Sequence, residues 1–226
     1  MDIVLVAGLW LDSSAWDAVV ERLGSMGHRA DAVALPGQGA PPATASLEDQ
    51  RSAVVAAVDA CDGPVMVVGH SAAGTLAWLA ADSRPDKVAR VVMIGGFTSG
   101  DGATYADFFP IEDGLMAFPG WEPFEGPDSA DLDEVQRADF AARAVPVSGA
   151  VATAAVHLAD ERRYGIPVSL ICPEYSPEQA KGWIEGGEVP ELARAESVEY
   201  VNIDSGHWPM VTRPDELAKL IDELAT

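Results

Sequence analysis

The feature that most restricts the fold of this chain is a short apolar run that ends at a serine. Residues 65–68 read Val-Met-Val-Val, Gly69 and His70 lead to Ser71, and small residues follow at 72–74. Such a run is typical of a buried strand, and the apolar residues after it recur at helical spacing: Leu76, Leu79 and Ala80. We predict a strand, a sharp turn and a helix start, which would hold the Ser71 hydroxyl exposed beside the first backbone N–H of the helix. A serine that merely caps a helix gives the same short pattern.

The rest of the chain repeats this order of apolar strand and helix. Strands are expected at residues 3–6, 30–35, 88–94, 167–172 and 197–203, in addition to the run before Ser71. Helices are expected after the first strand and at 46–60, 71–81, 176–186 and 214–224. Six strands separated by helices predict an α/β fold, with a mostly parallel six-stranded sheet and helices on both faces.

The alternation stops between residues 97 and 164. This segment is rich in glycine, proline and aromatic residues, and two helices divided at Pro146 are expected in it. Because these helices would have little core of their own, we interpret 97–164 as a cap inserted into a core formed by 1–96 and 165–226. A chain of 226 residues is of a size that α/β folds reach as one domain.

Composition argues against several classes of partner. The formal net charge is −22, from 36 acidic and 14 basic residues, and such a surface repels nucleic acid and anionic membranes. No basic segment precedes the first apolar run and no apolar run is long enough to span a bilayer, so we expect a cytoplasmic protein. We expect it to be a monomer or a homodimer. The two cysteines, Cys61 and Cys172, are too few for a disulfide framework and are expected to be buried thiols.

A serine nucleophile needs an adjacent base, and His207 is the candidate. It follows Gly206 in the loop after the last expected strand. Open α/β sheets build their sites at the carboxyl ends of parallel strands, and both Ser71 and His207 follow such ends. A Gly-His pair on its own also fits a surface turn. Together the two positions favour nucleophilic catalysis.

The sequence around Ser71 resembles the nucleophile elbow of the α/β-hydrolase family, Gly-x-Ser-x-Gly, with Ala73 in place of the last glycine. Residues 7–9, Ala-Gly-Leu, stand where this family usually has His-Gly-x after its first buried strand. The loops at 9–16 and 35–39 also look like loops of the family, so the resemblance covers nearly the whole chain outside the cap. It is to the small, lid-bearing members that include plant methylesterases and hydroxynitrile lyases.

The resemblance implies a role for each of four groups. Ser71 would be the nucleophile and His207 the general base, and the backbone N–H groups of Leu9 and Ala72 would bind the oxyanion. The histidine that the family has before Gly8 is absent, but a backbone donor does not depend on it.

The acid that orients the histidine is not fixed by the resemblance. Ser176 stands where the family has an Asp, after the strand expected at 167–172. Glu174, two residues earlier, is the first substitute, followed by Asp101 and Asp204. Two alternatives stay open: Glu174 is an ordinary surface glutamate, or the site is a dyad without an acid.

Aromatic residues are expected to roof an apolar acyl or alcohol pocket: Trp10, Phe97, Phe108, Phe109, Trp121 and Trp208. Any single one of them would equally serve to pack the cap onto the core. No cluster of His, Cys, Asp and Glu has metal-ligand spacing, and Gly-Gln-Gly after Pro36 lacks the rest of a phosphate-binding loop. We therefore expect no metal and no cofactor.

We predict a serine hydrolase that cleaves a small, mostly apolar carboxylic ester or lactone through an acyl-enzyme. The first alternative is a hydroxynitrile lyase-like enzyme on the same fold, with Ser71 and His207 used for proton transfer alone; it ranks lower because no lysine lies in the elbow or histidine loops. The second is a binding protein that has lost catalysis, which the missing Asp and Ala7 motivate.

Overall fold

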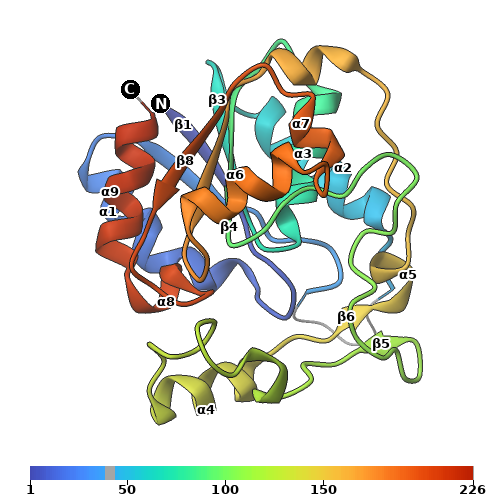
Figure 1. Cartoon of the computed structure of the whole chain (residues 1–226), viewed down its shortest axis with the longest axis vertical. Helices are drawn as coiled ribbons and strands as arrows, with labels where there is room; N and C mark the ends of the chain where they lie inside the picture. The colour runs from blue at the N-terminus through green and yellow to red at the C-terminus, as the bar shows by residue number, and fades with distance from the viewer. Residues whose placement is uncertain (39–43, 226) are drawn as a thin grey trace.

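The computed structural model describes residues 1–38 and 44–225. Its centre is a sheet of six strands in the order β2-β1-β3-β4-β7-β8 (Figure 1). Every pairing within this sheet is parallel, which confirms the predicted fold class. The strands are β1 (Asp2–Val6), β2 (Arg29–Ala32), β3 (Val65–His70), β4 (Val88–Ile94), β7 (Val168–Cys172) and β8 (Val198–Asn202).

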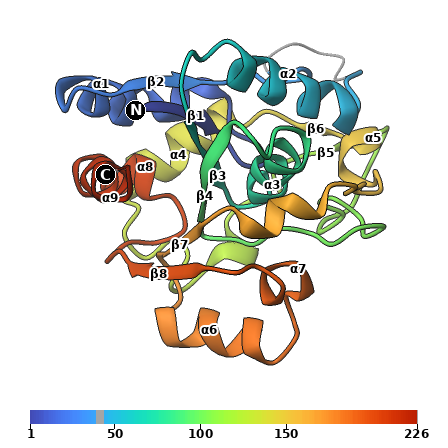
Figure 2. The same ribbon diagram turned by 90° about the horizontal axis from the view of Figure 1, so that it is seen from above.

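Helices bury both faces of the sheet. One face packs against α1 (Asp17–Ser25) and α9 (Pro214–Leu224), which lie side by side in Figure 2. The other face packs against α2 (Leu47–Asp59), α3 (Ala73–Ser83) and α6 (Pro177–Glu185). Because both faces are covered, all six residues of β3 are buried, and its first four residues are a continuous apolar run without polar alternation.

The cap segment, residues 97–164, adds no strand to this sheet. It contains β5 (Leu115–Met116), the 3-10 turn η2 (Glu122–Phe124), α4 (Glu134–Arg143), β6 (Val147–Ser148) and α5 (Gly149–Ala152), and the 3-10 turn η3 (Glu161–Gly165) spans its end. Of the two helices expected around Pro146, the first is α4. The second is only the four-residue α5, because β6 pairs with β5 as a short antiparallel ribbon and uses the residues that would have begun a longer helix.

All six strands run in one direction, so their carboxyl ends share one edge of the sheet. Figure 1 shows the part of the cap around α4 below this edge. The remaining short elements are the 3-10 turn η1 (Ser13–Trp16), α7 (Pro190–Ala193) and α8 (Pro209–Thr212). Within residues 1–38 and 44–225, no helix has the length and apolar character needed to cross a bilayer.

Candidate active site

Ser71 occupies the turn between β3 and α3. Its φ of 53° lies in the left-handed region, which costs a non-glycine residue roughly 1 to 2 kcal/mol. Its backbone N–H donates to the carbonyl oxygen of Ile94 on β4 at 2.7 Å. Gly69 allows the turn to close, since a Cβ there would lie 2.2 Å from the carbonyl oxygen of Ala73. A strained turn between strand and helix is the geometry that presents a serine hydroxyl above a sheet.

Two glycines after β4 bring Ser71 and His207 to the same place. A Cβ on Gly96 would lie 2.9 Å from Ser71 Cα, and a Cβ on Gly95 would lie 3.1 Å from His207 Nδ1. Gly95 also has a φ of 60°, which favours glycine. Ser71 and His207 therefore contact adjacent residues of one short connection at the carboxyl edge of the sheet. Neither glycine was predicted as part of the site from the sequence, although the Gly-Gly pair directly follows a buried strand, where a close approach of backbone to the site can be expected.

His207 is held by hydrogen bonds at three points. Its Nδ1 lies 2.8 Å from Glu174 Oε1, its backbone N–H donates to the carbonyl oxygen of Asp128 at 2.7 Å, and its own carbonyl oxygen lies 2.7 Å from His70 Nε2. A carboxylate only accepts hydrogen bonds, so Nδ1 of His207 carries the ring hydrogen. The lone pair on Nε2 of His207 is then free to accept a proton. The ring is thus oriented as a base.

The structure brings one of the three candidate carboxylates to His207. Glu174 follows β7 and is largely buried, with 13% of its side chain exposed. Asp101 is exposed and accepts the backbone N–H of Leu158 in the cap, and Asp204 is exposed next to β8. Only Glu174 among these three is hydrogen-bonded to the imidazole.

Ser176 stands where the resemblance leads one to expect an Asp, and it has a different task. It is the N-cap of α6: its hydroxyl oxygen accepts the N–H of Gln179, whose side chain accepts the N–H of Ser176. This reciprocal box satisfies two backbone donors at the helix start. The carboxylate that contacts His207 belongs to Glu174, two residues earlier, whose side chain is one methylene longer than that of Asp.

The loop after β1 packs directly on the elbow. A Cβ on Gly8 would lie 2.7 Å from His70 Nδ1 and 3.2 Å from Ser71 Cβ, so only glycine allows this approach. Trp10 follows with a φ of 63°. In the described part of the chain, neither the N–H of Leu9 nor that of Ala72 donates to a protein acceptor. These are the two donors predicted for an oxyanion, and both are available.

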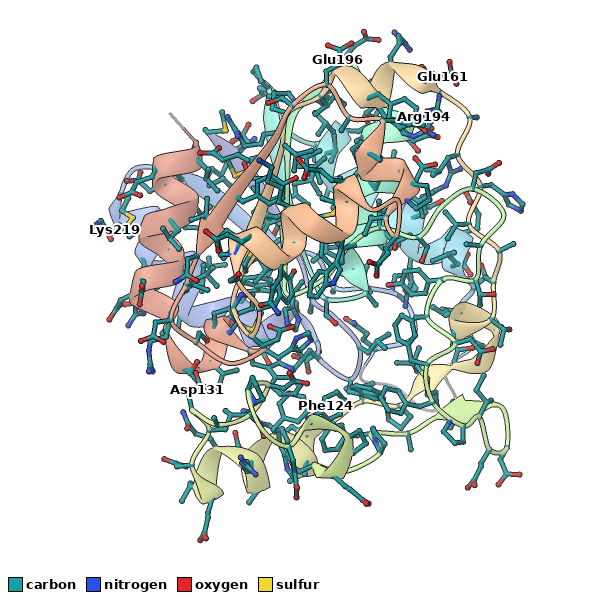
Figure 3. All side chains as sticks on the ribbon, in the orientation of Figure 1. Phe124, Asp131, Glu161, Arg194, Glu196 and Lys219 are labelled. Atoms are coloured by element: carbon teal, nitrogen blue, oxygen red, sulfur yellow. The ribbon has the colours of Figure 1, made fainter. Side chains whose placement is uncertain are left out.

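Four of the six predicted pocket residues belong to one aromatic cluster between cap and core. We define this cluster by its contacting rings: Trp10, Phe109, Phe118, Trp121, Phe124, Phe140 and Trp208. It extends to the site, because the Trp208 ring lies 4.9 Å from the ring of His207. Figure 3 shows Phe124, from the cap, at the level where cap and core meet.

The other two predicted pocket residues lie elsewhere. Phe108 was placed wrongly: 62% of it is exposed, because a tight turn in which its N–H donates to the carbonyl oxygen of Ala106 directs it to solvent. Phe97 packs in a separate group, with ring centroids 5.6 Å from Tyr175 and 5.9 Å from Trp183. This second group lies beside the loop that carries Glu174.

The space enclosed beside the loop after β1 is small. A cavity of about 20 Å³ is lined by residues 7–11 of this loop and, among others, by Tyr105 and Val151 of the cap. This volume accommodates about one water molecule.

Asp128 was not among the carboxylates considered from the sequence. It is in the cap, and its carbonyl oxygen accepts the N–H of His207 at 2.7 Å. Burial, and then the charge of Glu174, raise the pKa of the Asp128 carboxyl, while His207 lowers it in part. A Cβ on Gly206 would lie 2.4 Å from both the carbonyl oxygen of Asp128 and Oδ1 of Asp131. The cap therefore rests on the backbone of the histidine loop, at the place where Figure 3 shows Asp131.

The surroundings of both cysteines disfavour a reactive thiolate. Cys172 is buried at the end of β7, and burial raises the pKa of its thiol to about 12. Cys61 is only partly buried, where full burial was expected, and burial raises the pKa of its thiol too. Among residues 1–38 and 44–225, no three His, Cys, Asp or Glu side chains are grouped so that they could hold a metal ion.

Parts of the chain are similar in sequence to known hydrolases. It is 36% identical over 98 residues to the esterase PIR7B of Oryza sativa subsp. japonica, and 31% identical over 143 residues to the pyrethroid hydrolase of Sphingobium wenxiniae. The matched segments are 40% and 61% of this chain, and the chain spans only 37% and 47% of the length of these two relatives.

A solved structure matches the whole fold. An extracellular α/β-hydrolase from a Paenibacillus species superposes with a TM-score of 0.80 at 21% identity, over 99% of this chain and 98% of the other. A sequence model of the α/β-hydrolase family matches residues 3–220. The match covers both halves of the core and the cap between them, and the chain therefore belongs to the α/β-hydrolase family.

Proposed function

We propose that this protein is a carboxylic ester hydrolase that forms an acyl-enzyme on Ser71. The observation that carries the proposal is the 2.8 Å contact of Glu174 Oε1 with His207 Nδ1, beside an elbow that presents Ser71. The names of the two relatives, an esterase and a pyrethroid hydrolase, support the same class of reaction.

The proposed reaction has two halves, acylation of Ser71 and hydrolysis of the acyl-enzyme, and the same groups act in both. Ser71 Oγ attacks the ester carbonyl carbon while its proton moves to His207 Nε2, and the N–H groups of Leu9 and Ala72 bind the oxyanion. The tetrahedral intermediate collapses, and the departing alkoxide takes the proton from Nε2. Water then attacks the acyl-enzyme by the same route in reverse, which releases the acid and restores Ser71. The Glu174 carboxylate stabilises the imidazolium in both halves.

Ser71 Oγ makes no hydrogen bond with the residues that the structure describes, His207 included. In such sites this contact often forms only when substrate is bound.

The proposed substrates are neutral esters or lactones with a small, mostly apolar acyl group. The aromatic cluster beside His207 favours apolar groups, and the small cavity next to Leu9 favours short ones. The net charge of −22 disfavours polyanionic substrates. With p-nitrophenyl esters of increasing chain length, we expect kcat/KM to be greatest for the short acyl chains.

The proposal is tested by covalent labelling. A fluorophosphonate probe should modify Ser71, and p-nitrophenyl acetate should give a burst of about one equivalent of p-nitrophenol before steady turnover. Ser71→Ala should abolish both, while Ser25→Ala, at an exposed serine on α1, should keep both. A folded wild-type protein that the probe does not modify at residue 71 would contradict the proposal.

The same experiment separates the alternatives. A lyase that uses Ser71 only for proton transfer would show no acyl adduct on the Ser71 peptide by mass spectrometry. A binding protein would show a higher melting temperature with ligand and no turnover.

A further inference from the structure

His70, the residue before Ser71, contacts the backbone of His207. It ends β3 and is 1% exposed. Its Nε2 lies 2.7 Å from the carbonyl oxygen of His207, and the two rings are 4.9 Å apart between centroids. A carbonyl oxygen only accepts hydrogen bonds, so Nε2 of His70 carries a hydrogen and donates it.

The opposite nitrogen of the same ring faces backbone. Nδ1 of His70 is buried and has no hydrogen-bond partner within the described residues, and Gly8 packs close to it, since a Cβ on Gly8 would lie 2.7 Å away. A proton on Nδ1 would be a buried donor without an acceptor, which is unfavourable. Burial, helped by the neighbouring His207, lowers the pKa of His70 to about 3. The ring is therefore neutral and fixed in one tautomer.

We propose that His70 is a positioning residue, whose Nε2–H ties the loop of His207 to the elbow and so sets the distance over which Ser71 passes its proton to His207. The inference rests on the proposed function, since the proton transfer is part of it.

The contacts of His207 with Glu174, Asp128 and His70 constrain different parts of the residue. Glu174 orients the ring, and Asp128 belongs to the cap. The contact from His70 is the one that comes from the strand that carries Ser71 itself. The end of β3 therefore contacts both partners of the proposed proton transfer, through residues that lie outside the cap.

Two variants separate this role from a merely structural one. In His70→Gln the side-chain amide nitrogen can take the place of Nε2 and still donate, whereas His70→Met has a similar size and no donor. With a short-chain p-nitrophenyl ester, we expect His70→Met to lower kcat by about 10- to 100-fold with KM within about twofold of wild type. We expect His70→Gln to recover kcat to within about threefold to fivefold of wild type.

A second measurement does not depend on turnover. The chain has 4 histidines, so nitrogen-15 spectra of its imidazoles can be assigned with single variants. We expect His70 to remain the Nε2–H tautomer without titrating between about pH 5 and pH 8. The Nδ1–H signal of His207 should be protected from exchange in wild type and in His70→Gln, and should exchange faster in His70→Met.

The outcomes are distinct. A His70 ring that titrates in this range, or that carries its hydrogen on Nδ1, would overturn the inference, as would a folded His70→Met enzyme with wild-type kcat and His207 exchange. If His70→Met does not fold, the spectra of wild type and His70→Gln decide. If wild type has no turnover that depends on Ser71, the proposed function fails, and the spectra still decide whether His70 holds the His207 loop.

Discussion

Glu174 Oε1 lies 2.8 Å from His207 Nδ1, and the two residues belong to loops that follow adjacent parallel strands, β7 and β8. Both side chains are largely buried, at 13% and 14% exposed. The carboxylate therefore fixes the tautomer of His207 in a site partly removed from water, where such a contact is stronger than at a surface. The second carboxylate oxygen, Oε2, is buried without a partner among the described residues. Within the described residues, the His207 ring is thus hydrogen-bonded through Oε1 alone.

Glu174→Gln should lower kcat strongly, because the amide can present its NH₂ group to Nδ1 and favour the wrong tautomer of His207. In the serine protease triad the corresponding change costs about 10⁴-fold, and we expect a loss of between about 100-fold and 10,000-fold, with KM changed little. Steady-state kinetics on a short-chain ester checks this. Asp204→Asn, at the exposed acid close to the same histidine loop, is the matched control and should stay within about twofold of wild type. Equal activity of both variants would argue for a dyad without an acid.

The elbow and the histidine loop could be predicted because each is a local pattern. A buried strand followed by Gly69, His70 and Ser71 determines its own turn, and His207 follows a strand that reads clearly from its apolar residues. The choice between Glu174, Asp101 and Asp204 could not be made this way. It depends on which side chain the packing of separate loops brings within 3 Å of an imidazole, and no local pattern encodes that.

The cap was predicted less well, for a related reason. Its boundaries stand out as a change in composition, but its internal structure depends on contacts with distant residues. Phe108 is in an aromatic-rich stretch and yet faces solvent, while Asp128 is in a polar turn and yet binds the backbone of His207. A second helix was expected after Pro146, and the pairing of β6 with β5 replaced most of it.

Gly206→Ala should separate the cap from the histidine loop. The new Cβ would lie 2.4 Å from the carbonyl oxygen of Asp128 and 2.4 Å from Asp131 Oδ1, and the backbone of the cap has no room to accept it without moving. We expect the free energy of unfolding to fall by about 1 to 3 kcal/mol, as for other overpacked sites, and kcat to fall by at least about 10-fold. Urea unfolding and steady-state kinetics measure the two effects.

Gly182→Ala is the control for this substitution. Gly182 is inside α6, and a Cβ there would meet nothing within 4 Å. Replacing a helical glycine by alanine should raise stability by roughly 0.5 to 1 kcal/mol and leave kcat unchanged. If Gly206→Ala behaved in the same way, the close contact of cap and histidine loop would not exist in solution.

His70 should make the stability of the protein depend on pH. Above about pH 6.5 the residue binds no proton in the folded or the unfolded chain, whereas between about pH 6.5 and pH 3 only the unfolded chain binds one. The free energy of unfolding should therefore fall as the pH falls through this range, by up to about 1.4 kcal/mol per pH unit. From pH 7 to pH 5, wild type should lose about 2 kcal/mol more than His70→Gln, which has no such group. Urea unfolding of both proteins at a series of pH values gives the two slopes, and parallel slopes would mean that His70 is not held neutral.

A buried ion cluster at the far end of the sheet should matter for stability and not for catalysis. Arg163, 4% exposed, lies 3.1 Å from Asp82 Oδ1 and 3.1 Å from Glu191 Oε2. Asp82 is in the last turn of α3, whose first turn adjoins the elbow, so the cluster lies a full helix length from Ser71. Arg163→Met would leave two buried carboxylates without their cation, and we expect a loss of about 3 to 5 kcal/mol in the free energy of unfolding. The kcat of the folded protein should not change.

Arg194→Met is the matched test of that explanation. Arg194 pairs with Glu161 at 2.6 Å in the same region, but both side chains are more than half exposed. Figure 3 shows these two residues at the end of the molecule opposite to Asp131 and Phe124. An exposed pair contributes about 0 to 1 kcal/mol, so thermal or urea unfolding should show little effect for Arg194→Met and a large one for Arg163→Met. Similar losses for both variants would mean that burial of the carboxylates is not the cause, and a fall in kcat of folded Arg163→Met would show that the cluster acts on the site through α3.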